Sequence, residues 1–216
     1  MKSIVTIGGG SGHAQVLKSL RHISGATVTA ICPSTDSGGS TGVLRGEYGG
    51  SGYIGDLTKC VAALATDPVI ASAFMYRYGP GALAGHSMKN ILFHTLEMVS
   101  DLDTALTHLW HIAGIEPHRV FPVSGQSAEL CARLRLGNTI TGETSIDTIA
   151  RNPLWNPEVH AITDIYLKPH IEASSSVLEA IRSADHIIVC PGDLYSSIIP
   201  VLLPKGMKET LKKGNT

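Results

Sequence analysis

Several signatures are scarce or missing in this sequence of 216 residues. Aromatic side chains are few, with three Phe, two Trp and six Tyr. Neither sign of charge dominates, because the sequence has 17 Lys and Arg and 18 Asp and Glu. A basic surface for nucleic acid is therefore not indicated, and we expect no nucleic-acid partner. No apolar run approaches the ~20 residues that cross a bilayer, so we expect no membrane insertion.

Cysteines are also few, and they are scattered. The four thiols form no C-x-x-C pair, which argues against a structural zinc site; they are Cys32, Cys60, Cys131 and Cys190. The chain opens directly into a strand pattern, so no signal peptide is indicated. The simplest interpretation is a cytoplasmic protein with reduced, mostly buried thiols.

What the sequence does contain is an alternation of strand and helix patterns. Short apolar or β-branched runs predict strands at 3–12 (ending in a glycine turn), 27–32, 119–124, 162–169 and 186–190. Helical spacing predicts helices at 13–23, 57–66, 68–78, 88–99, about 101–114 and 177–184, with N-caps that include Asp56 and Asp67. This order predicts an α/β fold: a three-layer, Rossmann-like, mostly parallel sheet with helices on both faces.

One segment has a different period. In 129–143, Leu130, Ala132, Leu134 and Leu136 alternate with polar or small residues, and Gly137 opens a turn. We interpret this segment as a small antiparallel hairpin insertion at about 125–145. No linker or repeat is evident, so the prediction is a single domain over 1–216.

Three predicted strands end in loops of unusual composition. They are 8–12 after the first strand, 36–42 after the second and 191–197 after the last. In open α/β sheets, ligands bind beyond the carboxyl ends of the strands. We therefore expect the three loops to converge on one crevice.

The first loop favours phosphate binding but matches no standard fingerprint. The third glycine of G-x-G-x-x-G is His13 when counted from Gly8 and Gln15 when counted from Gly10. There is no Walker sequence, and no acid ends the second strand, which disfavours a nicotinamide oxidoreductase. Glycine amides at a helix N-terminus still suit an anion. The alternative is a tight turn without a ligand.

The other motifs each allow a structural alternative. Asp36 suits a sugar hydroxyl or a divalent ion, or it only nucleates an Asx-turn. In 85–90, His86 and Asn90 lie about one turn apart, and Ser87 can be an N-cap and nothing more. Tyr195 can stack on a base or be an amphipathic core residue. There is no strong nucleophile signature.

Seven motifs taken in order resemble the CofD-like superfamily, and most of all its YvcK-type members. They are 7-IGGGSG-12, 35-TDSGGSTGVLR-45, 55-GD-56, 85-GHSMKN-90, 121-FPVS-124, 142-GE-143 and 191-PGDLYSSIIP-200. The family includes CofD, which transfers a 2-phospho-L-lactate group from a guanylyl donor to a deazaflavin precursor. It also includes YvcK-type proteins, which are associated with carbon metabolism and cell shape and bind UDP-sugars.

The resemblance implies a set of ligand residues. They are Gly9, Gly10, Ser11, Gly12, Asp36, Gly38, Gly39, Ser40, Asp56, His86, Asn90, Gly192, Leu194, Tyr195 and Ser196. Asp36 is the candidate for a catalytic base or for holding magnesium; no other cofactor is implied. The family usually has an acid where Ser37 stands, a glycine at Lys89 and a serine at Asp193.

YvcK-type proteins also continue beyond the last motif, so we expect a short branch or a fragment, and an exposed sheet edge that favours a homodimer.

Two functions follow from the resemblance. The first is a regulatory protein of gluconeogenic growth and cell-wall control that binds a nucleotide diphosphate of the UDP-sugar type without turnover. The second is a CofD-like transferase, which would need an apolar and aromatic acceptor pocket beside the donor. The scarcity of aromatic residues favours the first. We expect Asp36→Ala and Gly12→Val each to abolish binding without unfolding the protein.

Overall fold

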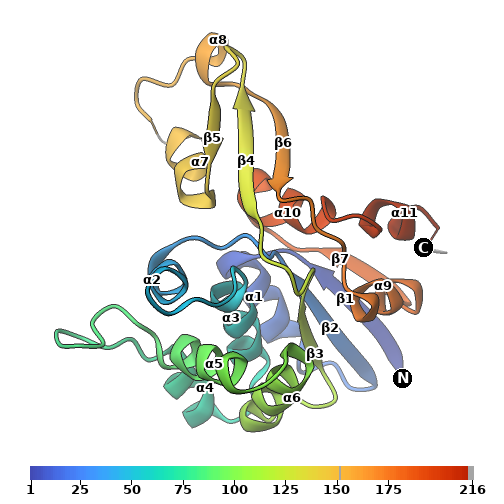
Figure 1. The fold of residues 1–216 in the computed structure, drawn as a ribbon. Helices are drawn as coiled ribbons and strands as arrows, with labels where there is room; N and C mark the ends of the chain where they lie inside the picture. Colours follow the sequence, from blue (N-terminus) through green and yellow to red (C-terminus); the bar gives the residue numbers. More distant parts are fainter. Residues whose placement is uncertain (151, 214–216) are drawn as a thin grey trace.

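A four-stranded parallel sheet forms the centre of the computed structural model, which describes residues 1–150 and 152–213 (Figure 1). Its order is β3 (Arg119–Pro122), β2 (Ala26–Cys32), β1 (Lys2–Ile7) and β7 (His186–Val189). All three pairings are parallel, with Ile7 beside both Ile31 and Val189. Hydrophobic runs this short and this rich in β-branched residues are typical of strands buried on both faces.

Helices cover both faces of this sheet, which confirms the predicted three-layer architecture (Figure 1). One face carries α1 (Gly10–Leu20), α3 (Ile54–Leu64), α4 (Pro68–Met75), α5 (Met88–Val99) and α6 (Leu102–Ala113). The other carries α9 (Ser175–Arg182), α10 (Ile199–Leu202) and α11 (Met207–Lys213). Along β2, Val28 and Ala30 join the first core and Ile31 joins the second, as the period of two requires.

A second, antiparallel sheet stands apart from the first. Its order is β5 (Thr139–Thr141), β4 (Glu129–Leu134) and β6 (Ile162–Lys168), and it carries α7 (Glu143–Ala150) and the short α8 (Pro157–His160). The predicted hairpin is present as β4 and β5. The strand expected at 162–169 pairs with β4 rather than with the parallel sheet, so this small sheet is larger than the expected insertion.

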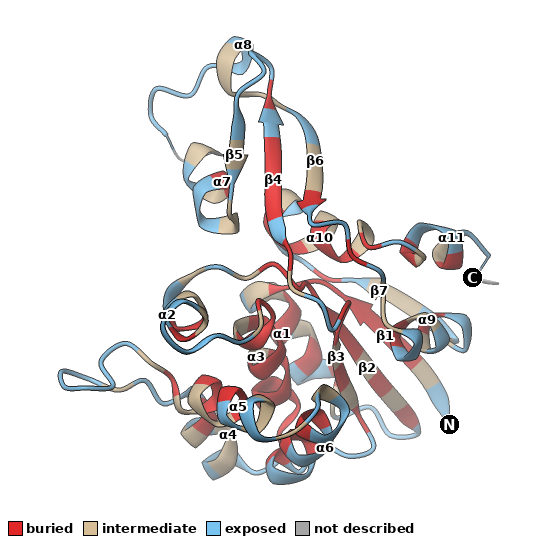
Figure 2. Ribbon diagram, in the orientation of Figure 1, coloured by how far each residue is buried: buried red, intermediate tan, exposed pale blue. Residues whose placement is uncertain are grey.

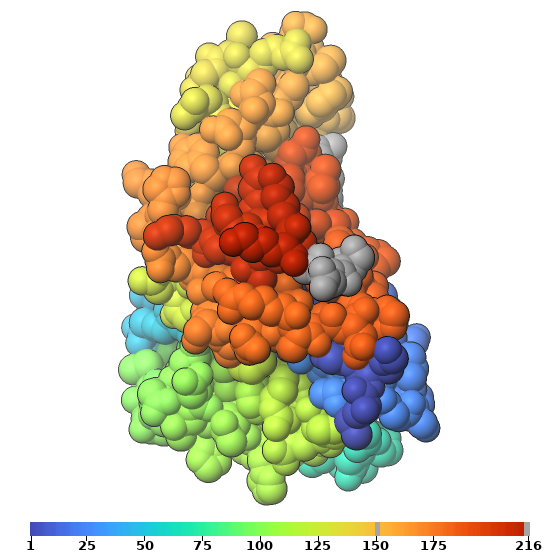
Figure 3. All heavy atoms as spheres, turned by 90° about the vertical axis from the view of Figure 1, so that its right-hand side faces the viewer, coloured from blue at the N-terminus to red at the C-terminus, as the bar shows by residue number. Residues whose placement is uncertain are grey.

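The small sheet has its own core and projects as a lobe. Buried side chains on β4, β6 and α7 form a third hydrophobic cluster, which includes Leu130, Ile146 and Leu167. Figure 2 shows β4 buried at the centre of this sheet, between the more exposed β5 and β6. In Figure 3 the yellow and orange residues of the lobe rise above the parallel sheet and its helices.

Three local predictions are wrong at their boundaries. The loop expected over 33–56 contains α2 (Gly39–Tyr48), because buried Thr41 and Leu44 give it an inward face despite its glycines. Helix α1 begins at Gly10 within the glycine run, rather than at residue 13. Asp56 is not an N-cap: α3 begins at Ile54 after Tyr53, so the carboxylate lies within the first turn.

The predicted cap at Asp67 is confirmed, and the helix expected at about 101–114 is present as α6. Asp67 accepts hydrogen bonds from the backbone N–H groups of Val69 and Ile70, and Pro68 is the first residue of α4. Helix α6 is capped by Asp101 and ends at Gly114 in the left-handed conformation. Among the described residues, no helix combines the length and the apolar character needed to traverse a lipid bilayer.

Candidate functional site

The candidate site lies beyond the carboxyl ends of the parallel strands, where the strand order changes direction. The chain passes from β1 to β2 and β3 on one side, and β7 returns to the other side of β1. In doubly wound sheets the crevice at such a point is where ligands bind. The loops after β1, β2 and β7 all reach this end of the sheet, as the sequence predicted.

The loop after β1 is held by Asp56. The backbone N–H of Gly10 donates a hydrogen bond to Oδ1 of Asp56, with the two atoms 3.0 Å apart. A Cβ on Gly9 would lie 2.5 Å from Oδ2 of the same carboxylate. Asp56 is buried and also pairs with Lys59 at 3.5 Å. The glycines therefore admit a protein carboxylate against the loop, and Gly10 adopts a positive φ of 67°.

Gly12 has a packing role that the sequence did not reveal. A Cβ at this position would lie 2.0 Å from the carbonyl oxygen of Pro191, so α1 and the loop after β7 touch through their backbones. The expectation that Gly12→Val would spare the fold is therefore wrong. Ser11, its neighbour, is exposed at the start of α1.

Asp36 nucleates an Asx-turn, which was one of the two predicted roles of this residue, and its carboxylate also faces α3. Its Oδ1 accepts a hydrogen bond from the backbone N–H of Gly38 at 3.0 Å. A Cβ on Gly55 would lie 2.1 Å from its Oδ2. Burial, followed by the charge of Asp56, raises the pKa of Asp36. The charge of Asp56 therefore acts on Asp36.

The motif at 85–90 adds a buried cation. Nδ1 of His86 lies 2.9 Å from Oγ of Ser40, which ties α2 to the start of α5. Oδ1 of Asn90 accepts hydrogen bonds from Thr58 and from Nζ of Lys89, both at 2.8 Å. Lys89 is only 4% exposed, and burial together with Lys59 lowers its pKa to about 8. Direct ligand contacts by His86 and Asn90 stay predictions.

Sequence reasoning missed two carboxylates, on α7. Burial, followed by the charges of Asp56, Asp36 and Asp147, raises the pKa of Glu143 to about 9. Oε2 of Glu143 and Oδ1 of Asp147 are buried and have no hydrogen-bond partner among the described residues. The motif at 142–143 includes Glu143, but the sequence did not show where this residue lies. The packing of α7 near the turn at Gly38 brings it to this site, since Oγ1 of Thr144 would lie 3.3 Å from a Cβ at Gly38.

The motif after β7 forms one turn of π-helix, η1 (Leu194–Ile198), with its own cap. Oδ1 of Asp193 accepts hydrogen bonds from the backbone N–H groups of Tyr195 and Ser196, at 2.9 and 3.1 Å. Ser196 is buried and Leu194 is about half exposed. Gly192 lies close to the first loop, because its Cβ would be 3.6 Å from the carbonyl oxygen of Gly9.

Beside this turn is a cavity of about 410 Å³. It is mostly apolar and lies between η1 and the small sheet; its lining includes Ile146, Asp147, Trp155, His160, Asp193 and Tyr195. Tyr195 also packs against the third hydrophobic cluster, so both of its predicted roles are compatible with the structure.

Asp36, Asp56 and Glu143 do not form a ready-made metal site, because their carboxylate oxygens do not all lie within 4.8 Å of one another. Their chemistry nevertheless suits a hard divalent cation. Oxygen donors from Asp36, Asp56 and Glu143 are the type that Mg²⁺ prefers. Burial is the main cause of the raised pKa values of Asp36 and Glu143, and the charges of neighbouring carboxylates add to it; a bound cation would offset this second contribution. The buried Oε2 of Glu143, which lacks a partner, is available to such an ion.

Comparison with known proteins places the chain in a family. The family model described as "2-phospho-L-lactate transferase CofD" matches residues 4–216. A protein of Pasteurella multocida (strain Pm70) named "Putative gluconeogenesis factor" is 34% identical over 218 residues, covering all of this chain and 67% of that protein. A protein of the same name from Thermotoga maritima is 36% identical over 213 residues, covering 98% and 64%.

A solved structure agrees with these relatives. The crystal structure of a UPF0052 family member from Bacillus halodurans superposes with a TM-score of 0.89 at 30% identity, over all of this chain and 67% of that one. The chain thus spans about two thirds of the length of these relatives. By sequence and by fold, the chain belongs to the CofD family.

Proposed function

We propose that the chain binds a nucleotide diphosphate of the UDP-sugar type in this crevice and acts as a regulatory protein. The process that it regulates would be gluconeogenic growth together with cell-wall and cell-shape control. The names of the relatives support the metabolic part of this proposal. The ligand is argued from the residues of the site.

The observation that carries the proposal is the group of carboxylates at the switch point, of which Asp56 and Asp36 accept hydrogen bonds from the amides of Gly10 and Gly38. The ionised carboxylates of Asp36 and Asp56 would repel a free diphosphate, since like charges disfavour each other strongly when desolvated. A divalent cation between the carboxylates and the diphosphate would turn this repulsion into binding. We therefore expect binding to require magnesium, with Lys59 and Lys89 supplying further positive charge.

The cavity beside η1 is the proposed position of the nucleoside. Tyr195 and Trp155 line it, and an aromatic ring can stack on a base. Asp193 lines the same cavity, and neighbouring Gly192 lies near Gly9, so a ligand in the cavity can extend toward the glycine loop.

The test is calorimetric titration of the chain with a UDP-sugar, GDP and NAD, each with magnesium and with EDTA. We expect UDP-sugar to bind only with magnesium, and without turnover. Asp36→Asn and Glu143→Gln should each weaken binding by about tenfold or more, as expected when a charged ligand group is lost. Asp164→Asn, on the exposed part of β6, is the matched control and should leave binding unchanged. Equal binding in EDTA would refute the metal-bridged site.

A CofD-like transferase is the second candidate, supported by the description of the matching family model and by the cavity. The cavity is mostly apolar and is lined by Trp155 and Tyr195, which supports the predicted acceptor pocket despite the small number of aromatic residues. Transfer of a phospholactate group from a nucleotide diphosphate donor to an acceptor hydroxyl would release the nucleoside monophosphate. Chromatographic detection of that monophosphate, dependent on the acceptor, would favour this candidate over the regulatory protein.

A further inference from the structure

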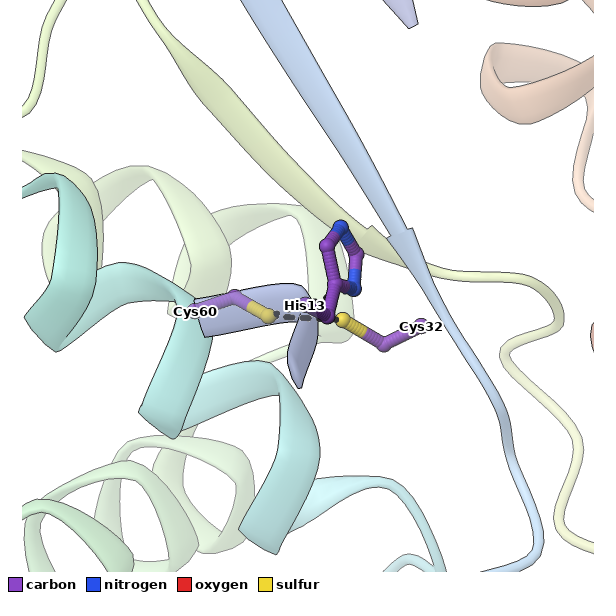
Figure 4. A group of neighbouring side chains, drawn as sticks. All are labelled: His13, Cys32 and Cys60. Atoms are coloured by element: carbon purple, nitrogen blue, oxygen red, sulfur yellow. Dashed lines mark hydrogen bonds between the residues drawn. The ribbon is translucent and has the colours of Figure 1, made fainter. Parts of the chain in front are cut away.

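Directly beneath the candidate site, three side chains that have no part in the proposed ligand binding meet in the core. They are His13 from α1, Cys32 from the end of β2 and Cys60 from α3 (Figure 4). All three are fully buried. In the figure the two sulfur atoms point toward each other, next to the imidazole ring.

Their distances are those of a reactive thiol pair. Sγ of Cys32 and Sγ of Cys60 are 3.5 Å apart, and Sγ of Cys60 is 3.6 Å from Nδ1 of His13. Burial opposes ionisation of Cys60, but the thiol of Cys32 and the imidazole of His13 outweigh it and lower its pKa to about 6. Burial raises the pKa of Cys32, so Cys60 is the more readily ionised of the two thiols. The thiolate is the form that reacts.

The histidine is fixed for this role and not for a metal. Nδ1 lies 2.8 Å from the carbonyl oxygen of Gly8, which only accepts, so this nitrogen carries a proton. Nε2 lies 2.8 Å from the hydroxyl of buried Thr6. Both ring nitrogens therefore have protein partners, and the protonated Nδ1 also faces the sulfur of Cys60.

Each member of the cluster lies close in sequence to one loop of the site. His13 follows Gly9 and Gly10 on the first turn of α1, and Cys32 precedes Asp36 by four residues. Cys60 follows Asp56 by four residues on α3, so the two lie on the same side of that helix. A bond between the two sulfurs would therefore join the segments that carry Asp36 and Asp56.

We propose that Cys32 and Cys60 are a peroxide-sensitive dithiol that forms an intramolecular disulfide beneath the ligand site. Cys60 gives its proton to His13, which becomes an imidazolium; Cys60 Sγ then attacks one oxygen of hydrogen peroxide, the O–O bond breaks, and the departing hydroxide takes that proton from the imidazolium and leaves as water. The sulfenic acid on Cys60 is then attacked by Cys32 Sγ, the S–O bond breaks, and hydroxide leaves with the proton of Cys32 as a second water. Two thiols are oxidised and one peroxide is reduced.

The disulfide would change the site because the sulfurs must approach further. A disulfide needs a separation of about 2.05 Å, so the two side chains must rotate or the ends of β2 and α3 that carry them must shift. Asp36 follows β2 and Asp56 lies on α3, so a shift of these segments would change the positions of both carboxylates. We expect the oxidised protein to show altered amide exchange over 33–38 and 53–60.

The test treats the folded chain with increasing hydrogen peroxide, unfolds it, alkylates the remaining thiols and maps non-reduced tryptic peptides. Cleavage at Arg45 and Lys59 places the two cysteines in different peptides, so their disulfide gives a distinct mass. We expect this cross-linked peptide to appear, to vanish after reduction, and to form while Cys131 stays free. Cys131, buried in the small sheet, is the matched control thiol. His13→Asn should slow the cross-link by about tenfold or more, because the thiolate fraction falls.

Several results would overturn the proposal. Oxidation of the exposed Met98 serves as the control that peroxide has reacted with the protein. If Cys32 and Cys60 were recovered as free thiols at the dose that oxidises Met98, the proposed peroxide-sensitive dithiol would be refuted. Preferential linkage of Cys60 to nearby Cys190 would refute the pairing. Purification of the chain with one zinc or copper ion that blocks both thiols would show a metal site instead. The peptide map needs no ligand, so its result is independent of the proposed nucleotide binding.

Discussion

Individual glycines differ in whether the structure has room for the methyl group that an alanine substitution would add. A Cβ at Gly12 would collide with the backbone oxygen of Pro191, whereas a Cβ at Gly46, on α2, would meet nothing within 4 Å. We expect Gly12→Ala to lower the free energy of unfolding by about 1–3 kcal/mol through overpacking. Gly46→Ala should raise it by up to about 1 kcal/mol, because alanine favours a helix. Urea unfolding measures both; equal effects of the two variants would contradict the packing role of Gly12.

Glu143 predicts a pH dependence of stability. Its pKa is about 9 in the folded chain and 4.5 as the ordinary value, so between these values the folded state binds more protons than the unfolded state. Stability from this group is therefore fully present below pH 4.5 and is lost as pH rises toward 9, by up to about 1.4 kcal/mol per pH unit. Thermal unfolding in EDTA should show this decline.

Glu143→Gln removes the titrating group and should flatten that decline, making the variant more stable than the parent at pH 8. Glu209→Gln, at an exposed position on α11, is the control and should follow the parent. Magnesium should stabilise the parent most at high pH, where the carboxylate is ionised. An unchanged slope in Glu143→Gln would assign the pH dependence to other groups.

At the scale of elements, the turn η1 depends on its cap. Asp193 satisfies two backbone N–H groups of this short element, and Tyr195 projects from it into the cavity. We expect Asp193→Ala to cost about 1 kcal/mol locally and to weaken nucleotide binding by loosening Tyr195. Asp193→Asn keeps a capping oxygen and should retain most of the affinity. Calorimetry of the two variants checks this; equal losses would mean that the charge, and not the cap, matters.

Helices also differ in how well local sequence signals their ends. Asp67-Pro68 and Gly114 mark helix boundaries because capping uses only neighbouring backbone groups. Helix α2 was missed because its glycines argue for a loop, and only burial of Thr41 and Leu44 against other elements compensates for them. Strand β6 was recognised as a strand, but its partner β4 is set by the packing of the small sheet.

For the whole molecule, the exposed edge of the parallel sheet bears on assembly. Strand β7 pairs with β1 and has no second partner among the described residues, and Val189 on it is 56% exposed. Such an edge can pair with another chain. We expect a homodimer in sedimentation velocity, and Val189→Lys should convert it to monomers. Val99→Lys, at an exposed position ending α5, is the control and should stay dimeric; a monomeric parent would make the prediction wrong.

The sequence by itself determined the strand and helix alternation, the α/β class and the loops at which a ligand is expected. It could do so because periodicity and capping are local: they depend on which face of an element is buried and on its nearest backbone groups. Asp36 was recognised for the same reason, as an acid in a glycine-rich loop that follows a strand, whereas Asp56 was assigned to the site by the family resemblance alone.

Only the tertiary structure decided which distant groups meet. Glu143 reaches Asp36 and Asp56 because α7 packs over the turn at Gly38, and the thiols of Cys32 and Cys60 face each other because α3 packs on β2. Periodicity predicts that a residue is buried, but it does not predict which residues it will contact. Which partners meet is set by how whole elements pack in three dimensions, and the charge repulsion and thiol reactivity of this protein arise from those contacts.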